Sequence, residues 1–171
     1  MHLGALQALE FDRIVEVLRS QAVTPLGAAR LAALRPASDP RRVAQGLAGT
    51  TEGVKYAEEH DALPLQAPPD IETILASLAI EGRALEPVRL LSLATFLESI
   101  ELTRAAIRRT EDQFPILRTI AEAGSSFKGE IANVRHAIDE SGEVQDQASP
   151  ELRSIRDRLR RQRTRLRGTL E

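Results

Sequence analysis

The sequence predicts an all-α fold, an irregular domain of seven or eight helices of uneven length. Ala and Leu, two residue types with high helix propensity, contribute 24 and 23 of the 171 residues. Four segments place a polar residue directly before a proline, which is typical of an N-cap and the first residue of a helix. These segments are Thr24-Pro25, Asp39-Pro40, Glu86-Pro87 and Ser149-Pro150. Aromatic residues make up only 3%, so we expect an aliphatic core.

In the first half of the chain, apolar spacing and breaker residues separate four helices. The stretch 10–21 places Phe11, Ile14 and Leu18 on one broad face, as in an amphipathic helix. Pro36 ends the helix that begins at Pro25. The segment 63–69 holds three of the nine prolines and is predicted to be a loop. The helices expected in this half span residues 10–21, 25–35, 40–60 and 71–79.

In the second half, the longest uninterrupted helical pattern follows Glu86-Pro87. Two shorter helices come next, and then Asp139–Gly142 forms a predicted turn. The segment 143–146 is the one place where a short extended strand is expected. The helices expected in this half span residues 88–110, 115–123, 130–138 and 150–171.

The last helix carries a charge and an apolar pattern that set it apart. Residues 151–171 carry a net charge of +5, which leaves −7 for the other 150 residues because the whole chain carries −2. Apolar residues recur there at steps of three and four, the spacing of a coiled-coil seam, interrupted by Gln162. The seam consists of Leu152, Ile155, Leu159, Leu166 and Leu170. One flank of it carries Arg153, Arg156, Arg160, Arg163 and Arg167, and the other flank carries Arg158, Arg161 and Arg165.

Three interpretations of this basic helix are open. In the favoured one, a Glu-rich antiparallel helix outside this chain packs on the seam, and the arginines pair with its carboxylates. In the second, the arginines contact nucleic-acid phosphates, which guanidinium groups suit geometrically. In the third, the arginines form a solvated face that reflects the general use of Arg in this chain, which has 21 Arg and 2 Lys.

The sequence offers no catalytic, cofactor-binding or metal-binding residues. Cys is absent, which excludes disulfides, thiolate metal sites and a Cys nucleophile. No phosphate-loop motif is present, and His2, His60 and His136 lack partners at metal-ligand spacing. No apolar run approaches the length of a membrane span, and no secretory signal precedes the first helix, so we expect a cytoplasmic protein without membrane contact.

Two stretches resemble a known family. Residues 6–14 read Leu-Gln-Ala-Leu-Glu-Phe-Asp-Arg-Ile, and 22–27 read Ala-Val-Thr-Pro-Leu-Gly. The more specific stretch reads Ala-Ile-Asp-Glu-Ser-Gly-Glu-Val at 137–144 and continues as Ala-Ser-Pro-Glu-Leu at 148–152. In this order, and over essentially the whole chain, the sequence resembles the second bacterial branch of MutS proteins, the recombination-suppressing endonuclease type.

The resemblance implies a division of the chain into a helical core domain, 1–148, and the interrupted start of a lever helix, 149–171. Proteins of this family contain an ATPase domain that uses ATP and Mg²⁺, a clamp and a nuclease domain, and they form homodimers. They bind branched or unusual DNA, and they are implicated in splitting collided ribosomes, with rRNA as a partner. No residue of this chain matches the ATP-binding or nuclease motifs. The implied role is a mechanical scaffold that links ATPase to clamp; the alternative is a free-standing helical interaction module that pairs by coiled coil.

Overall fold

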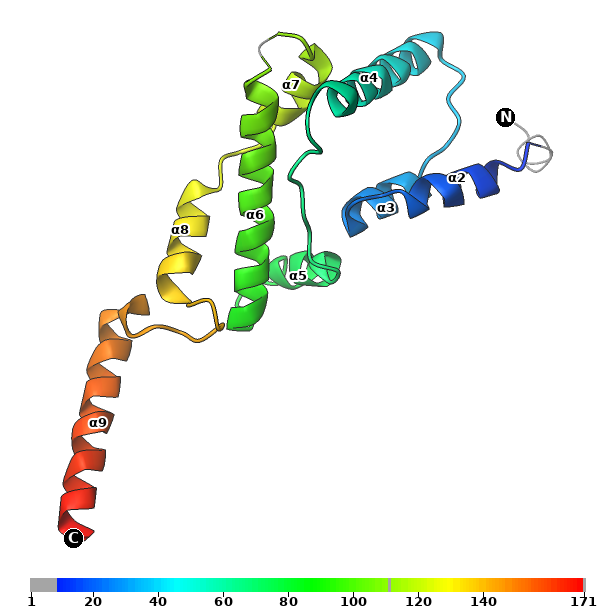
Figure 1. Ribbon diagram of the computed structural model, residues 1–171. Helices are drawn as coiled ribbons and strands as arrows, with labels where there is room; N and C mark the ends of the chain where they lie inside the picture. Colours follow the sequence, from blue (N-terminus) through cyan, green and yellow to red (C-terminus); the bar gives the residue numbers. More distant parts are fainter. Residues whose placement is uncertain (1–8, 111, 171) are drawn as a thin grey trace.

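The computed structural model describes residues 9–110 and 112–170, and these residues form helices joined by loops, with no strand among them (Figure 1). The predicted all-α class is therefore confirmed. Most helix ends lie within two residues of the predicted ends. In chain order the elements are α2 (Phe11–Ser20), α3 (Pro25–Ala32), α4 (Pro40–Glu59), α5 (Ile71–Leu78), α6 (Pro87–Arg108), α7 (Pro115–Glu122), α8 (Lys128–Ala137), the 3₁₀ helix η1 (Asp146–Ala148) and α9 (Pro150–Leu170).

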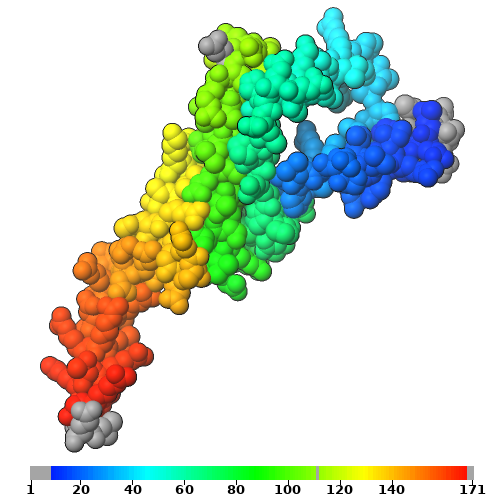
Figure 2. All heavy atoms as spheres, in the orientation of Figure 1, coloured from blue at the N-terminus to red at the C-terminus, as the bar shows by residue number. Residues whose placement is uncertain are grey.

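Helix α6 is the centre of the molecule, and α5, α7 and α8 pack against it. Helices α2 and α3 pack on each other and reach the centre through α5, whereas α4 docks on α7. Helix α9 projects away from the opposite end (Figure 2). The molecule is elongated as a result. Its accessible surface is 13131 Å², whereas a compact monomer of this mass exposes roughly 8,300 Å².

The predicted cap-proline starts are confirmed at all four positions. Three of them carry the expected side-chain cap, which satisfies a backbone N–H that has no partner within the helix. Thr24 Oγ1 accepts from the N–H of Gly27 at 3.1 Å, and Asp39 Oδ1 accepts from that of Arg41 at 2.9 Å. Ser149 Oγ accepts from the N–H of Leu152 at 3.1 Å. At the start of α6, the side chain of Glu86 makes no cap.

Helix α7 is held at both ends by side chains of other helices. At its start, Glu52 Oε2 of α4 accepts from the backbone N–H groups of Ile116 and Leu117, at 2.8 and 3.0 Å. At its end, Arg104 of α6 donates from Nε to the Ala121 carbonyl at 2.8 Å. The Arg104 side chain is buried, and its Nη1 also donates to the Ser125 carbonyl at 2.6 Å. Charged caps thus replace the backbone partners that both ends of α7 lack.

Carboxylates of α6 also fix α8. Glu101 Oε1 accepts from the backbone N–H of Phe127, directly before α8, at 2.9 Å. One turn earlier on α6, both oxygens of Glu98 accept from Arg135 of α8, at 2.9 and 2.7 Å. A bidentate pair of this kind restricts both the position and the orientation of the two helices.

The core is small and not purely aliphatic, which corrects the expectation drawn from the low aromatic content. Tyr56, Ile107, Phe114 and Ala121 form its cluster of buried residues, where α4, α6 and α7 meet. The ring of His60 stacks on that of Tyr56 with centroids 4.8 Å apart. Two of the five aromatic residues, Tyr56 and Phe114, thus lie where α4 docks.

The connection between α8 and α9 is a tight hairpin-like turn. The strand expected at 143–146 does not form; instead Ile138 and Val144 make one isolated antiparallel bridge. Ladder pairing stops there because Asp146 already belongs to η1. In the turn, Asp139 Oδ1 accepts from the N–H and hydroxyl of Ser141, at 2.9 and 2.6 Å, and from the N–H of Glu143 at 2.9 Å. The motif at 137–144, which carries the family resemblance, is thus a turn whose backbone N–H groups are capped by the side chain of its own Asp139.

We predict that acid weakens the contacts between α6 and α8. The Arg135 guanidinium lowers the pKa of Glu98, and the Phe127 N–H lowers the pKa of Glu101. Because the folded-state pKa lies below the unfolded value, this stabilisation is complete above the unfolded pKa and is lost as pH falls through the folded pKa. Thermal unfolding between pH 7 and pH 3 should show the loss. It should be smaller in Glu98→Gln than in a control, Glu72→Gln on the exposed side of α5. Equal pH dependence in both variants would contradict the prediction.

We also predict that Gly142 is required for the turn. Its φ is +83°, and an added Cβ would lie 2.6 Å from Val88 Cγ2. Gly82 has a similar φ of +77° with open space around it, so Gly82→Ala measures the left-handed backbone cost alone, about 1–2 kcal/mol. Gly142→Ala should cost more than this, because the added Cβ also forces the Val88 side chain to move. Urea unfolding followed by circular dichroism measures both. Equal losses in the two variants would show that the Val88 contact has no effect.

Candidate interaction surface on the last helix

The predicted seam lies along one face of α9 and is largely exposed. Leu152 is half-buried, and Ile155, Leu159 and Leu166 are 46%, 50% and 65% exposed. The side chain of Leu170 lies outside the described residues. Among the described helices, η1 alone packs against α9. The seam therefore has the spacing of a coiled coil and an apolar surface that no other described helix covers.

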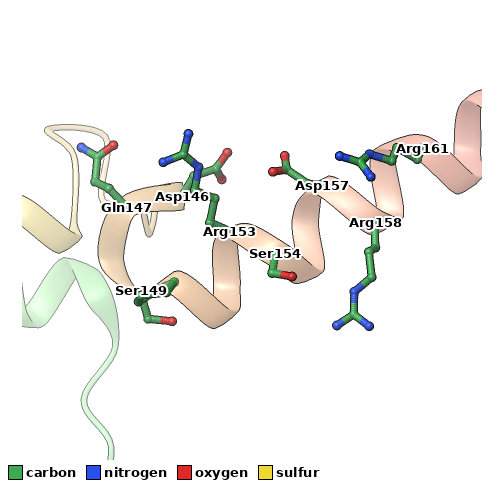
Figure 3. Close-up of a pocket in the computed structure, with 9 residues that line it drawn as sticks. Asp146, Gln147, Ser149, Arg153, Ser154, Asp157, Arg158 and Arg161 are labelled. Carbon is green, nitrogen blue, oxygen red and sulfur yellow. The ribbon is translucent and has the colours of Figure 1, made fainter.

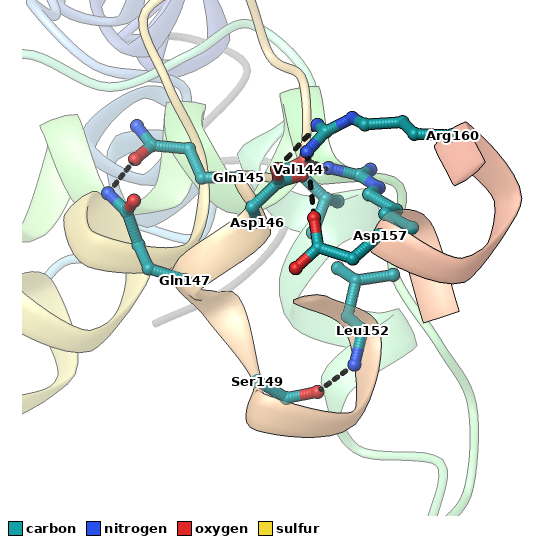
Figure 4. A network of polar contacts seen from close by, with 9 residues as sticks. Val144, Gln145, Asp146, Gln147, Ser149, Leu152, Asp157 and Arg160 are labelled. Atoms are coloured by element: carbon teal, nitrogen blue, oxygen red, sulfur yellow. Dashed lines mark hydrogen bonds and ion pairs between the residues drawn. The ribbon is translucent and has the colours of Figure 1, made fainter. Parts of the chain in front are cut away.

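The structure brings two of the predicted flank arginines together on one carboxylate (Figure 4). Arg156 Nη1 donates to Asp146 Oδ1 and Arg160 Nη2 to Asp146 Oδ2, both at 2.6 Å. Arg156 Nη1 also donates to the Val144 carbonyl at 2.8 Å, and Arg160 Nη1 to Asp157 Oδ1 at 3.2 Å. These contacts join the base of α9 to the turn and to η1.

The hydrogen bond from Arg156, followed by the one from Arg160, lowers the pKa of Asp146. The Asp146 carboxylate in turn raises the pKa of Arg160. Both shifts favour the charged forms of Asp146 and Arg160, and the bonds to Asp146 are charge-assisted. Their side chains remain partly open to solvent, so the pairs are screened by salt.

The other flank arginines are not part of this cluster. Arg153 lines an open groove at the base of α9, together with Asp146 and Asp157 (Figure 3). In that view Arg161 follows Asp157 on the same side of the helix, whereas Arg158 points to the opposite side. Arg163 and Arg167, on the outer half of α9, are exposed. The flank thus consists of Arg153 at the groove, an inner pair bound to Asp146, and an exposed outer pair.

Asp146 is the residue of this surface that the sequence alone did not reveal. It lies in the segment expected to be a strand, and its partners are ten and fourteen residues further along the chain. Helical periodicity relates residues three or four apart and contains no information on such a contact. The signal that was available is the placement of one acidic residue just before a strongly basic helix.

Two other kinds of feature are absent from the part of the chain that the structure describes. No group of three or more His, Asp or Glu side chains there has the arrangement of a metal site. No described helix combines the length and apolar character that crossing a bilayer requires.

Comparison with known proteins gives one consistent result. No protein-family model matches the chain. Proteins named endonuclease MutS2 match it: that of Geobacillus thermodenitrificans is 34% identical and aligns with 100% of this chain, and that of Geobacillus kaustophilus is 35% identical, also over 100%. The Exiguobacterium sibiricum protein of the same name is 33% identical over 94% of the chain.

The chain spans about one fifth of the length of these relatives, between 21% and 22%. The similarity thus covers the described helices from α2 to α9 and leaves most of each relative without a counterpart here. Over its whole length, this chain is related in sequence to the MutS2-type proteins.

Proposed function

We propose that this chain is the helical core segment and lever start of a MutS2-type protein that acts on DNA and suppresses homologous recombination. In this role it is a mechanical scaffold between an ATPase domain and a clamp, with residues 1–148 as the core and 149–171 as the start of the lever. ATP and Mg²⁺ would bind in the ATPase domain, outside these residues. The observation that carries the proposal is the whole-chain similarity to proteins named endonuclease MutS2.

The geometry of α9 supports this scaffold role. The helix projects from the body, contacts η1 alone among the described helices and exposes its apolar seam. A seam of this kind is suited to a second helix, and the outer arginines Arg163 and Arg167 are placed to pair with its carboxylates. We therefore favour coiled-coil pairing over phosphate contact for the outer half of the flank.

The proposed partners follow from the same role. They are branched DNA, and the ribosome and its rRNA, bound by the whole protein as a cytoplasmic homodimer. The alternative function is a free-standing interaction module that pairs through α9. The reading frame after Glu171 separates the two: a phosphate-loop motif within a few hundred codons supports the scaffold, and an immediate stop codon supports the module.

We predict that the 171-residue chain self-associates weakly through the seam. The exposed apolar stripe favours pairing, whereas repulsion among the arginines opposes it, so association should strengthen as salt screens the charges. Sedimentation velocity at low and high salt measures this. Ile155→Asn with Leu166→Asn should abolish the dimer, and Leu102→Asn, at an exposed leucine of α6, should not. A strict monomer at high protein concentration and high salt would contradict the prediction.

We predict that any binding of duplex DNA by this chain is weak, independent of sequence and steeply salt-dependent, because counterion release would supply most of the affinity. Reversal of Arg163 and Arg167 to Glu tests the outer flank without breaking the Asp146 contacts. Each lost phosphate contact should reduce the slope of log affinity against log salt by about 0.9. Reversal of Arg108 and Arg109, at the end of α6, is the matched control. If the slope falls by the same amount in both double variants, the phosphate-binding site does not lie on α9.

A further inference from the structure

At the base of α9, two arginines share one carboxylate, an arrangement that the net charge of the helix does not reveal. Arg156 and Arg160 lie one turn apart, about 6 Å along the helix axis, yet their guanidinium groups converge on the two oxygens of one carboxylate. Two guanidinium groups around one oxyanion is also the arrangement in which arginines bind a phosphate. Asp146 therefore occupies the position that a phosphate oxygen would take.

We propose that Asp146 is an internal competitor, which withholds Arg156 and Arg160 from the phosphates of duplex nucleic acid and at the same time fixes the direction of α9. The proposal rests on the nucleic-acid role given above and adds how that contact is regulated. An external phosphate gains the two arginines only by displacing Asp146, so the bound and closed states exclude each other.

The convergence of the Arg156 and Arg160 guanidinium groups favours a phosphate as their external ligand over the carboxylates of a partner helix. In a coiled coil, flank charges lie along the axis, and each pairs with its own partner residue. Here two cations meet at one point, at the base of the helix. Arg153 lines the same groove as Asp146, Asp157 and Arg160, which adds a third cation and a second carboxylate next to this point. A phosphate, with several charged oxygens, can accept from both converging guanidinium groups and still leave an oxygen for Arg153.

The same contacts control the direction of α9. Because η1 is the only described helix that packs on α9, the bonds from Arg156 and Arg160 to Asp146 are the main polar contacts between α9 and the rest of the molecule. Release of Asp146 removes both ion pairs and leaves the Val144 carbonyl as the acceptor for Arg156. Binding of a phosphate to the arginines and release of Asp146 are thus linked. Each must favour the other by the same factor.

The first experiment measures affinity for a 20-base-pair duplex DNA at low salt by fluorescence anisotropy. Asp146→Asn should bind at least about fivefold more tightly than Glu151→Gln. Glu151 also lies at the base of α9, so this control makes the same change in net charge without touching the arginine pair. Asp146→Glu keeps the competing charge and should bind within about twofold of the wild type. Equal affinity of Asp146→Asn and Glu151→Gln would overturn the proposal.

The second experiment measures the direction of α9. The chain has no native cysteine, so Leu102→Cys on α6 and Gln162→Cys on α9 can carry two spin labels. Pulsed electron resonance should give a narrow distance distribution in the wild type and a broad one in Asp146→Asn. The duplex should broaden the wild-type distribution, and a bound duplex that leaves it narrow would overturn the proposal.

Two further outcomes separate this proposal from the scaffold role. If no variant binds the duplex at high micromolar protein, the competitor proposal fails, whereas the scaffold role still depends on the reading frame and on self-association. If Asp146→Asn self-associates more tightly but binds the duplex no better, the arginine pair serves a partner helix and the phosphate assignment is wrong.

Discussion

The buried guanidinium of Arg104 is the contact on which the arrangement of the central helices depends. It binds the Ala121 and Ser125 carbonyls, so α6 determines where α7 ends and where the chain turns toward α8. Glu101, one turn away and within 3.4 Å of Arg104, does the same for the start of α8. A buried charge is costly unless it is fully hydrogen-bonded, and loss of either partner would leave backbone groups without a bond.

Contacts at helix ends matter here because the apolar core is small. The surface area far exceeds that of a compact monomer of this mass, and α2, α3, α8 and α9 contain no fully buried residue among those described. Apolar side chains such as Val17 and Leu47 are more than half exposed. The fold therefore depends on polar contacts with fixed geometry, which define orientations, more than on the burial of one large apolar volume.

Local features of the fold were predictable, and contacts between distant residues were not. The cap-proline pairs and the apolar spacing placed the helices well because both signals act within one or two turns. The position of α9 relative to the body depends on Asp146, and that of α7 depends on Glu52 and Arg104. Such pairs form only after the chain has folded back. The apolar face of α2 has the period of a packed helix, but no described helix other than α3 packs on it. Periodicity thus shows that a face is apolar without showing what covers it.

The two hydrogen bonds from α7 to Glu52 have a kinetic consequence. They join residues 64 and 65 positions apart, whereas Arg135 and Thr95, on α8 and α6, are 40 positions apart. Closing the longer loop costs somewhat more chain entropy before the contact stabilises anything. Helices α6, α7 and α8 are consecutive in sequence and can assemble first as one folding unit. We expect docking of α4 to follow as a later step, and the same contact to be where the folded chain begins to open.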